Sequence, residues 1–136
     1  MATGYDPFMT DNDPAVDRVG IVCERQPDGA WSASMTITEH DVNAHGVCHG
    51  GVVFLLADAV FDRVTNSDLP DGQTAFAANA NIEFVRAGAV GDTITAIGSA
   101  RDRWGRSTLV DVVVTNGADE TVAHFRGKTR TVNTDR

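Results

Sequence analysis

The chain has 136 residues and a formal net charge of −8, with a sequence pI near 4.7. This length suits one domain with a real hydrophobic core, and 42% hydrophobic and 22% charged residues are ordinary globular values. The acidic balance argues against a nucleic-acid partner. Residues 1–72 carry 12 acids and 3 arginines, whereas residues 73–136 carry 7 acids and 8 lysines or arginines. An anionic ligand would therefore find its cations in the second half.

Cysteine content and hydropathy indicate the compartment. Only Cys23 and Cys48 are present, too few for a disulfide framework. No basic-apolar signal segment opens the chain, and no apolar run approaches membrane-spanning length. We therefore expect a soluble protein of the reducing cytoplasm that has no membrane partner.

The first forty residues predict a short helix followed by a β-hairpin. Residues 1–12 are polar with scattered aromatics and are expected to form a loose lead-in. Asp13-Pro14 is typical of an N-cap with proline at the first helical position, which predicts a helix to about residue 19. Residues 19–25 predict a strand that ends at the turn 26–29. Residues 31–38 alternate apolar and polar, which predicts a half-buried strand paired with the first.

The sequence is centred on the stretch from Asp41 to Asn66, which reads DVNAHGVCHGG and then VVFLLADAVFDRVTN. The second part predicts a helix that is hydrophobic all round and therefore buried. Asp58 lies in its middle, and burying an ionised carboxylate is costly unless it is paired or functional. Asp58 is thus either a capped buried acid or the acid of a reactive cleft.

The glycine pair at the start of this helix favours a reactive cleft. Gly50 and Gly51 allow a ligand to approach the backbone closely, and the first amides of a helix are unpaired and partly positive. Such donors suit a phosphate or a developing oxyanion. Asp58 lies eight residues beyond Gly50, about 12 Å along the helix axis. That separation indicates that the acid and the donors meet across a dimer interface.

The second half predicts four more strands, over residues 76–84, 92–103, 109–115 and 121–131. The connections at 88–91, 104–106 and 116–117 have the lengths of hairpin turns, and residues 131–136 form a polar tail. One long helix among antiparallel strands predicts an α+β fold, with the sheet wrapped around the helix. We expect residues 1–136 to form a single domain.

Three motifs resemble a known family: HGVCHGGVVFLLADAVF at 45–61, IEFVRAGAVGDTITA at 82–96 and VAHFRGKT at 122–129. Their order and spacing are similar to those of the hotdog-fold acyl-CoA thioesterases of the phenylacetate-degradation (PaaI) type. The resemblance covers about residues 13–130. It implies a hotdog fold, hydrolysis of acyl-CoA to free acid and CoA without metal or cofactor, and a homodimer that doubles into a homotetramer. It also favours phenylacetyl-CoA or hydroxyphenylacetyl-CoA as the substrate.

The same resemblance implies roles for individual residues. Gly50 would donate its backbone N–H to the thioester carbonyl, Asn43 would contact the carbonyl or the attacking water, and Asp58 would be the catalytic acid from the neighbouring subunit. His49 and Gly51 would shape the loop. The residues expected to border the CoA groove are Gly105, Arg106, Ser107, Arg126, Gly127 and Lys128.

Two positions depart from the family's pattern. Ala87 stands where the family usually has a proline, directly after Arg86. Arg86 is itself an arginine of the family, but a role in a structural ion pair would explain it equally well. Asp62 is an unusual acid four residues after Asp58, which places the two Cβ atoms roughly 6 Å apart. Two such acids in a cleft cannot both ionise freely, so one pKa should rise. Asp62 would then hold the attacking water, or it would turn toward Arg63, another subunit's arginine or solvent.

The central stretch also contains possible metal ligands and a possible nucleophile. His45, Cys48 and His49 lie within five positions, but a structural zinc site normally has four ligands and no second cluster exists. Cys48 and His49 are adjacent in a loop, where side chains seldom point at each other, so a cysteine nucleophile is disfavoured. No G-x-S-x-G motif for a serine hydrolase is present.

Two alternative functions remain. A hotdog-fold enoyl-CoA hydratase would use an aspartate and a histidine five positions apart, whereas Asp41 and His45 are four apart and lack that motif's proline. A non-enzymatic acyl-CoA-binding protein would share the fold without the chemistry. Release of free thiol from acyl-CoA would distinguish the hydrolase from both alternatives.

Overall fold

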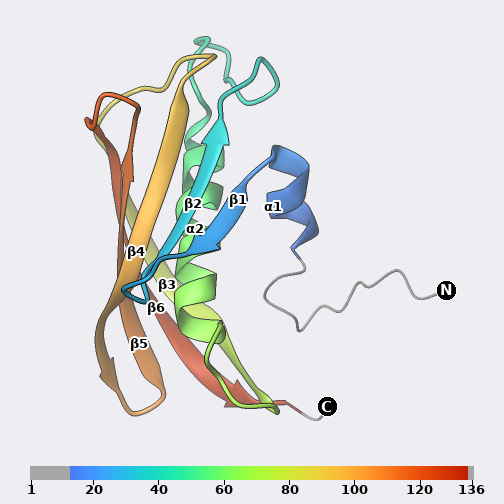
Figure 1. The fold of residues 1–136 in the computed structure, drawn as a ribbon, viewed down its shortest axis with the longest axis vertical. Helices are drawn as coiled ribbons and strands as arrows, with labels where there is room; N and C mark the ends of the chain where they lie inside the picture. Colours follow the sequence, from blue (N-terminus) through green and yellow to red (C-terminus); the bar gives the residue numbers. More distant parts are fainter. Residues whose placement is uncertain (1–12, 135–136) are drawn as a thin grey trace, which may run out of the picture.

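The computed structural model describes residues 13–134, so the predicted lead-in at 1–12 lies outside the described residues. A six-stranded antiparallel sheet wraps around one long helix, α2 (Figure 1). This arrangement confirms the predicted α+β architecture. The elements in chain order are α1 (Pro14–Val19), β1 (Val22–Arg25), β2 (Trp31–Thr36), α2 (Gly50–Asn66), β3 (Gln73–Phe84), β4 (Thr93–Trp104), β5 (Ser107–Thr115) and β6 (Thr121–Asn133).

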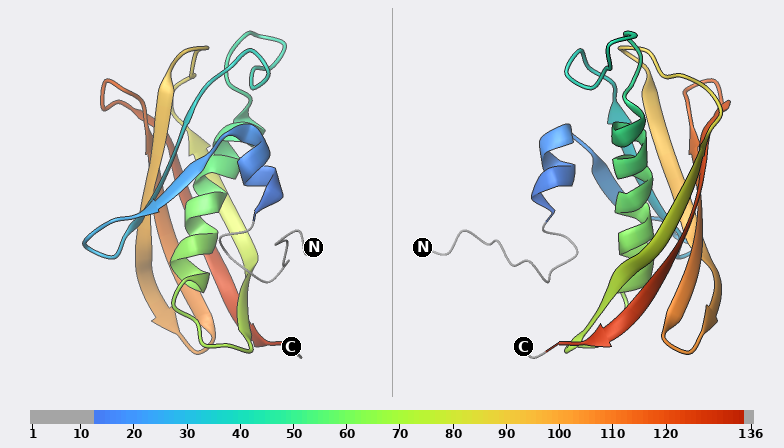
Figure 2. Two further views of the ribbon diagram at one scale, coloured as in Figure 1. Left: turned by 45° about the vertical axis from the view of Figure 1, so that its right-hand side comes forward. Right: turned by 180° about the vertical axis from the view of Figure 1, so that it is seen from behind.

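Helix α1 begins as predicted and ends at a glycine. The Asp13 carboxylate accepts a hydrogen bond from the Val16 amide at 3.3 Å. Gly20 ends the helix in the left-handed conformation, with φ of 81°. Val19 is therefore the last helical residue, and the prediction that it starts the first strand was wrong. Figure 2 shows α1 on the side of α2 that is turned away from the sheet.

The strand order is β1-β2-β4-β5-β6-β3. The predicted hairpins β1–β2, β4–β5 and β5–β6 are confirmed, and β6 continues to Asn133, within the predicted polar tail. The predicted hairpin at 88–91 was wrong, because β3 pairs with β6 and β4 pairs with β2. The connecting segment instead crosses the end of the sheet. Backbone groups of this segment form hydrogen bonds with other loops. The Gly88 carbonyl accepts from the Cys48 amide, and the Gly91 amide donates to the Ile37 carbonyl, each at 2.8 Å.

Helix α2 packs closely against the concave face of the sheet. Two strand glycines make this possible, since a Cβ on Gly98 would lie 2.8 Å from Cγ1 of Val60 and one on Gly127 would lie 2.6 Å from Cζ of Phe61. Such distances are too short for real carbon contacts, so any larger residue would force the helix away from the sheet. The packing fixes the position of α2 and therefore of its first residue, Gly50.

The prediction that α2 is apolar all round was wrong for one side. Val53, Leu56, Ala57, Val60 and Phe61 are buried, whereas Asp58 and Asp62 are only half-buried. The charge of Asp13, the N-cap of α1, acts on both acids. Neither helix in residues 13–134 is long and apolar enough to cross a membrane.

Candidate active site

The loop that leads into α2 is shaped by its own side chains. Oδ2 of the buried Asp41 accepts hydrogen bonds from the amide and the hydroxyl of Thr38, at 2.8 and 3.0 Å. Oδ1 of Asn43 accepts from the His45 amide at 2.9 Å. The carboxylate of Asp41 is thus used within a turn, and His45 is exposed. This arrangement disfavours the Asp–His pair that a hydratase would need.

One amide remains available at the start of α2. Nδ1 of His49 accepts a hydrogen bond from the Gly51 amide at 3.0 Å, and the His49 carbonyl accepts from the Val52 amide at 2.9 Å. Within residues 13–134 the Gly50 amide has no hydrogen-bond acceptor. It therefore presents a single free donor at the positive end of the helix dipole. Histidine is not a preferred N-cap residue, so sequence rules did not identify this capping role for His49.

Gly50 lines a largely apolar cavity of about 270 Å³. The ring of Phe84 lies directly against it, since a Cβ on Gly50 would be 3.1 Å from Cζ of Phe84. The sequence placed Phe84 in a strand and a family motif but gave no sign of this contact. The other residues that line the cavity are Val47, Cys48, Val53, Val85, Arg86, Ala87 and Gly88.

The polar groups around this cavity are neutral or already paired. Burial, together with the charge of Asp41, raises the pKa of Cys48 to about 11, which disfavours the reactive thiolate form. Arg86 donates from Nη1 to the Thr121 carbonyl at 2.9 Å and lies 3.6 Å from Glu120. The ion-pair interpretation of Arg86 is therefore confirmed. In the described part of the chain, no three His, Cys, Asp or Glu side chains are grouped to hold a metal ion.

The charge of Asp58 acts on Asp62, as their spacing predicts. Burial raises the pKa of Asp58, with a further contribution from the charge of Asp13. Burial and then the charges of Asp58 and Asp13 raise the pKa of Asp62 to about 6, against the opposing effects of Arg63 and Asn66. Both acids therefore hold a proton more readily than exposed carboxyls do.

Asp62 is oriented by Asn66 and forms no ion pair with Arg63. Nδ2 of Asn66 donates to Oδ1 of Asp62 at 3.0 Å, while the Arg63 guanidinium lies 5.7 Å from the ring centre of Trp31. Asn66 also bonds both backbone groups of Ala75, at 3.0 and 2.8 Å, which ties the end of α2 to β3. Asn66 was not among the site residues predicted from the sequence, although its position one turn beyond Asp62 was a usable signal.

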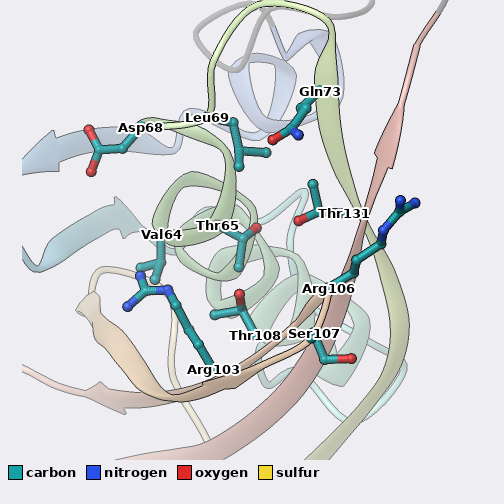
Figure 3. Close-up of a pocket in the computed structure, with 11 residues that line it drawn as sticks. Val64, Thr65, Asp68, Leu69, Gln73, Arg103, Arg106, Ser107, Thr108 and Thr131 are labelled. Atoms are coloured by element: carbon teal, nitrogen blue, oxygen red, sulfur yellow. The ribbon is translucent and has the colours of Figure 1, made fainter.

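The residues expected to border a CoA groove lie in separate places. Arg126 forms a two-pronged ion pair with Asp111, at 2.6 and 2.9 Å, on the exposed side of β6, and Gly127 faces the ring of Phe61. Gly105, Arg106 and Ser107 line a second cavity of about 350 Å³ beyond the C-terminal end of α2 (Figure 3). That end lies about 25 Å from Gly50 along the 17-residue helix. Within one chain, these groups do not converge on Gly50.

Residues 45–123 match the thioesterase superfamily. The chain belongs to this family. The acyl-coenzyme A thioesterase PaaI of Escherichia coli K12 is 36% identical over 124 residues, which cover 91% of this chain and 86% of PaaI. The similarity to this relative thus extends along nearly the whole chain.

Solved structures agree with this assignment. The E. coli PaaI protein, from the phenylacetic acid degradation operon, superposes with a TM-score of 0.82 at 35% identity, over 91% of this chain and 88% of that one. A Streptococcus mutans UA159 protein bound to acetyl-CoA superposes with a TM-score of 0.71 at 25% identity, over 79% and 85%. The predicted hotdog fold is therefore confirmed.

The raised pKa of Asp62 has a consequence for stability. A folded pKa of about 6, above the ordinary 3.8, means that the folded state binds this proton more tightly than the unfolded state. The contribution of Asp62 to stability is therefore fully present below about pH 4 and is lost as the pH rises through 6, by about 1–3 kcal/mol. Asp62→Asn removes the titration and keeps an acceptor for Asn66. We expect this variant to gain melting temperature over the wild type at pH 7.5 but not at pH 4.

Thermal unfolding at both pH values measures this effect. Asp17→Asn, in the exposed part of α1, is the control for removing one negative charge. A difference between Asp62→Asn and wild type that is the same at pH 4 and pH 7.5 would contradict the burial of an ionised Asp62.

Proposed function

We propose that the protein hydrolyses acyl-CoA thioesters to free acids and CoA. The observation that carries the proposal is the free Gly50 amide at the start of α2, which lines a cavity next to the entry loop. The relationship to E. coli PaaI supports acyl-CoA as the substrate class. The operon of that relative supports a phenylacetyl or hydroxyphenylacetyl group as the acyl part.

In this mechanism the thioester carbonyl accepts a hydrogen bond from Gly50. Negative charge develops on the carbonyl oxygen as the tetrahedral state forms, and the helix dipole stabilises it. Nδ2 of Asn43, which has no hydrogen-bond partner within residues 13–134, is available to the carbonyl or to the attacking water. His49 and Gly51 hold the loop through their mutual hydrogen bond.

Asp58 activates the nucleophile or is itself the nucleophile. As a general base it takes a proton from water while the water oxygen bonds to the carbonyl carbon; the C–S bond then breaks and the proton passes to the CoA sulfur. As a nucleophile its carboxylate oxygen bonds to the carbonyl carbon, the C–S bond breaks, and CoA leaves as a thiolate that takes a proton from water. Water then hydrolyses the mixed anhydride to the free acid and the Asp58 carboxylate. Asp62 lies one turn away with a raised pKa and is proposed to help hold that water.

The proposed site is shared between two copies of the chain. Gly50 and Asp58 are about 12 Å apart along α2, too far for one reacting carbonyl to contact both. Within residues 13–134, β3 pairs on one side only and exposes Phe76 and Phe84, so its open edge is available to a second copy. We propose a homodimer that doubles into a homotetramer, with the exposed Asn79, Asn81 and Glu83 as candidates for the second contact.

The CoA phosphates require local cations in a protein of charge −8. Lys128 and Arg106 form no ion pair within residues 13–134 and are proposed to supply them. Arg126 would first have to exchange Asp111 for a phosphate. Gly105 and Ser107 would border the same groove. We propose no cofactor besides the CoA of the substrate, and a cytoplasmic location consistent with the two free cysteines.

A non-enzymatic acyl-CoA-binding protein is the alternative from another functional class. The decisive assay measures thiol release from phenylacetyl-CoA, hydroxyphenylacetyl-CoA and acetyl-CoA by the purified protein. Turnover of any of them supports the hydrolase. Binding of all three without thiol release would establish the alternative.

Replacing Asp58 tests its role directly. Asp58→Asn keeps the shape of the side chain but removes the base, so we expect kcat to fall by at least about 10²-fold. The control is Asp17→Asn, which removes an exposed helical carboxylate that does not line the cavity and should retain wild-type turnover. An Asp58→Asn protein that keeps near-wild-type turnover would contradict the assignment.

Mixing two inactive variants tests the shared site. In a mixed dimer of Asn43→Ala and Asp58→Asn chains, one site loses both residues and the other retains both. Random mixing makes half of the dimers mixed, so activity should return to about a quarter of the wild-type value. Two affinity tags would confirm that mixed dimers form. Mixed dimers that remain inactive would show that each site lies within a single chain.

A further inference from the structure

We propose that Asp13 and Arg63 are positioning residues for the acid pair of α2, which consists of Asp58 and Asp62. Asp13 brings a negative charge to the pair from α1, and Arg63 brings a positive charge from α2 itself. The two charges oppose each other, and their balance decides how readily Asp62 keeps a proton. This inference rests on the proposed thioesterase function, in which the pair carries the chemistry.

Helix α1 holds the Asp13 carboxylate in a fixed position. The carboxylate accepts a hydrogen bond from the Val16 amide at 3.3 Å, and this cap restrains the side chain. Helix α1 contacts α2, and Val16 belongs to the same buried cluster as Leu56 and Ala57 of α2. Asp13 lies three residues before Val16, which is the spacing of neighbours on one helix face. The cap thus lies at the start of the face through which α1 packs.

The Arg63 guanidinium is held on an aromatic ring of β2. It lies 5.7 Å from the centre of the Trp31 ring, and Nε1 of Trp31 donates to Oγ of Ser67 at 3.2 Å. The ring is therefore fixed against the end of α2. A cation–π contact holds a cation without neutralising it. Within residues 13–134 Arg63 forms no ion pair, so its charge remains available to Asp62, the preceding residue.

Burial is the largest cause of the raised pKa of both acids, and neighbouring charges adjust it. Within residues 13–134 the side chains that shift the pKa of Asp58 or Asp62 are Asp13, Asp58, Arg63 and Asn66. No charged side chain of the sheet is among them. Asp13 raises the pKa of both acids, whereas Arg63 lowers that of Asp62. These two residues therefore supply the opposing charges from outside the pair.

The balance matters because the two acids need different protonation states in the proposed reaction. Asp58 must be ionised to activate water or to attack the carbonyl. A second negative charge one turn away would oppose that ionisation, so a proton on Asp62 favours it. Asp13 and Arg63 thus act through the acid pair rather than on the substrate.

The stability of Asp62→Asn tests both charges without any need for turnover. The measured quantity is its gain in melting temperature at pH 7.5 minus the gain at pH 4, at one protein concentration. We expect this difference to fall by about 1–4 °C in an Asp13→Asn background, because asparagine keeps the cap and removes the negative charge. It should rise by about 1–4 °C in an Arg63→Gln background, where the opposing charge is lost. Arg63→Lys keeps that charge and should restore the wild-type difference.

Asp17→Asn and Arg25→Gln are the matched controls. The first removes an exposed negative charge from α1, and the second removes the other guanidinium near Trp31, which lies 5.9 Å from the ring centre. Neither charge is among those that act on Asp62, so both backgrounds should give the wild-type difference. Asp13→Ser and Arg63→Met remove the same charges as the test variants and decide the question if one of those does not fold.

The pH profile of kcat/KM connects Asp13 with the reaction. Because Asp13 acts on both acids, Asp13→Asn should move the acidic limb to lower pH by about 0.3–1 pH unit, whereas Asp17→Asn should leave it in place. An acidic limb that does not move in Asp13→Asn would overturn the inference.

Two results of the melting experiment would also overturn it. They are equal pH differences in all backgrounds, or changes of the same sign in Asp13→Asn and Arg63→Gln. A wild-type protein that releases no thiol from any acyl-CoA would overturn the proposed function instead, because the melting temperatures still test the two charges.

Discussion

The close contact between α2 and the concave face of the sheet is the constraint on which the rest of the structure depends. Gly98 and Gly127 have no side chains where Val60 and Phe61 press against the strands, so the helix is held at backbone distance. The His49 cap fixes the first turn at one end, and Asn66 ties the last turn to β3 at the other. The Gly50 amide is therefore rigidly placed before any substrate arrives. Such preorganised donors stabilise a developing oxyanion without reorganising during the reaction.

This single helix also separates the two chemical groups that the proposed reaction needs. Its N-terminus offers a hydrogen-bond donor beside an apolar cavity, whereas its acids lie two turns later, where the charge of Asp13 acts on them. Burial next to α1 gives Asp58 and Asp62 raised pKa values, and Asp13, the cap of α1, adds to the effect. A second copy of the chain is the simplest way to bring a donor and an acid to one carbonyl. The proposed dimer thus follows from the length of the helix.

Local signals in the sequence predicted local structure. Asp13-Pro14 predicted the start of α1, and the apolar run after Gly50-Gly51 predicted α2. Strand-like runs, with alternation clearest at 31–38 and 76–84, predicted all six strands. The connection at 88–91 was misread because its length fits a hairpin, whereas the pairing of β3 with β6 depends on contacts distant in sequence. For the same reason the sequence predicted Gly50, Asp58 and Asp62 as site residues but did not reveal three other roles. His49 caps α2, Asn66 ties the end of α2 to β3, and Phe84 lines the cavity beside Gly50. Those roles arise from packing between elements, which periodicity does not encode.

The most direct test of the shared site is a crystal structure with an acyl-CoA analogue in which a methylene group replaces the thioester sulfur. This change keeps the carbonyl and prevents hydrolysis. We predict that the carbonyl oxygen lies about 2.7–3.1 Å from the Gly50 nitrogen of one chain. We also predict that the Asp58 carboxylate of a second copy lies beside the carbonyl carbon. A carbonyl bound away from Gly50, or approached by Asp58 of the same chain, would contradict the shared site.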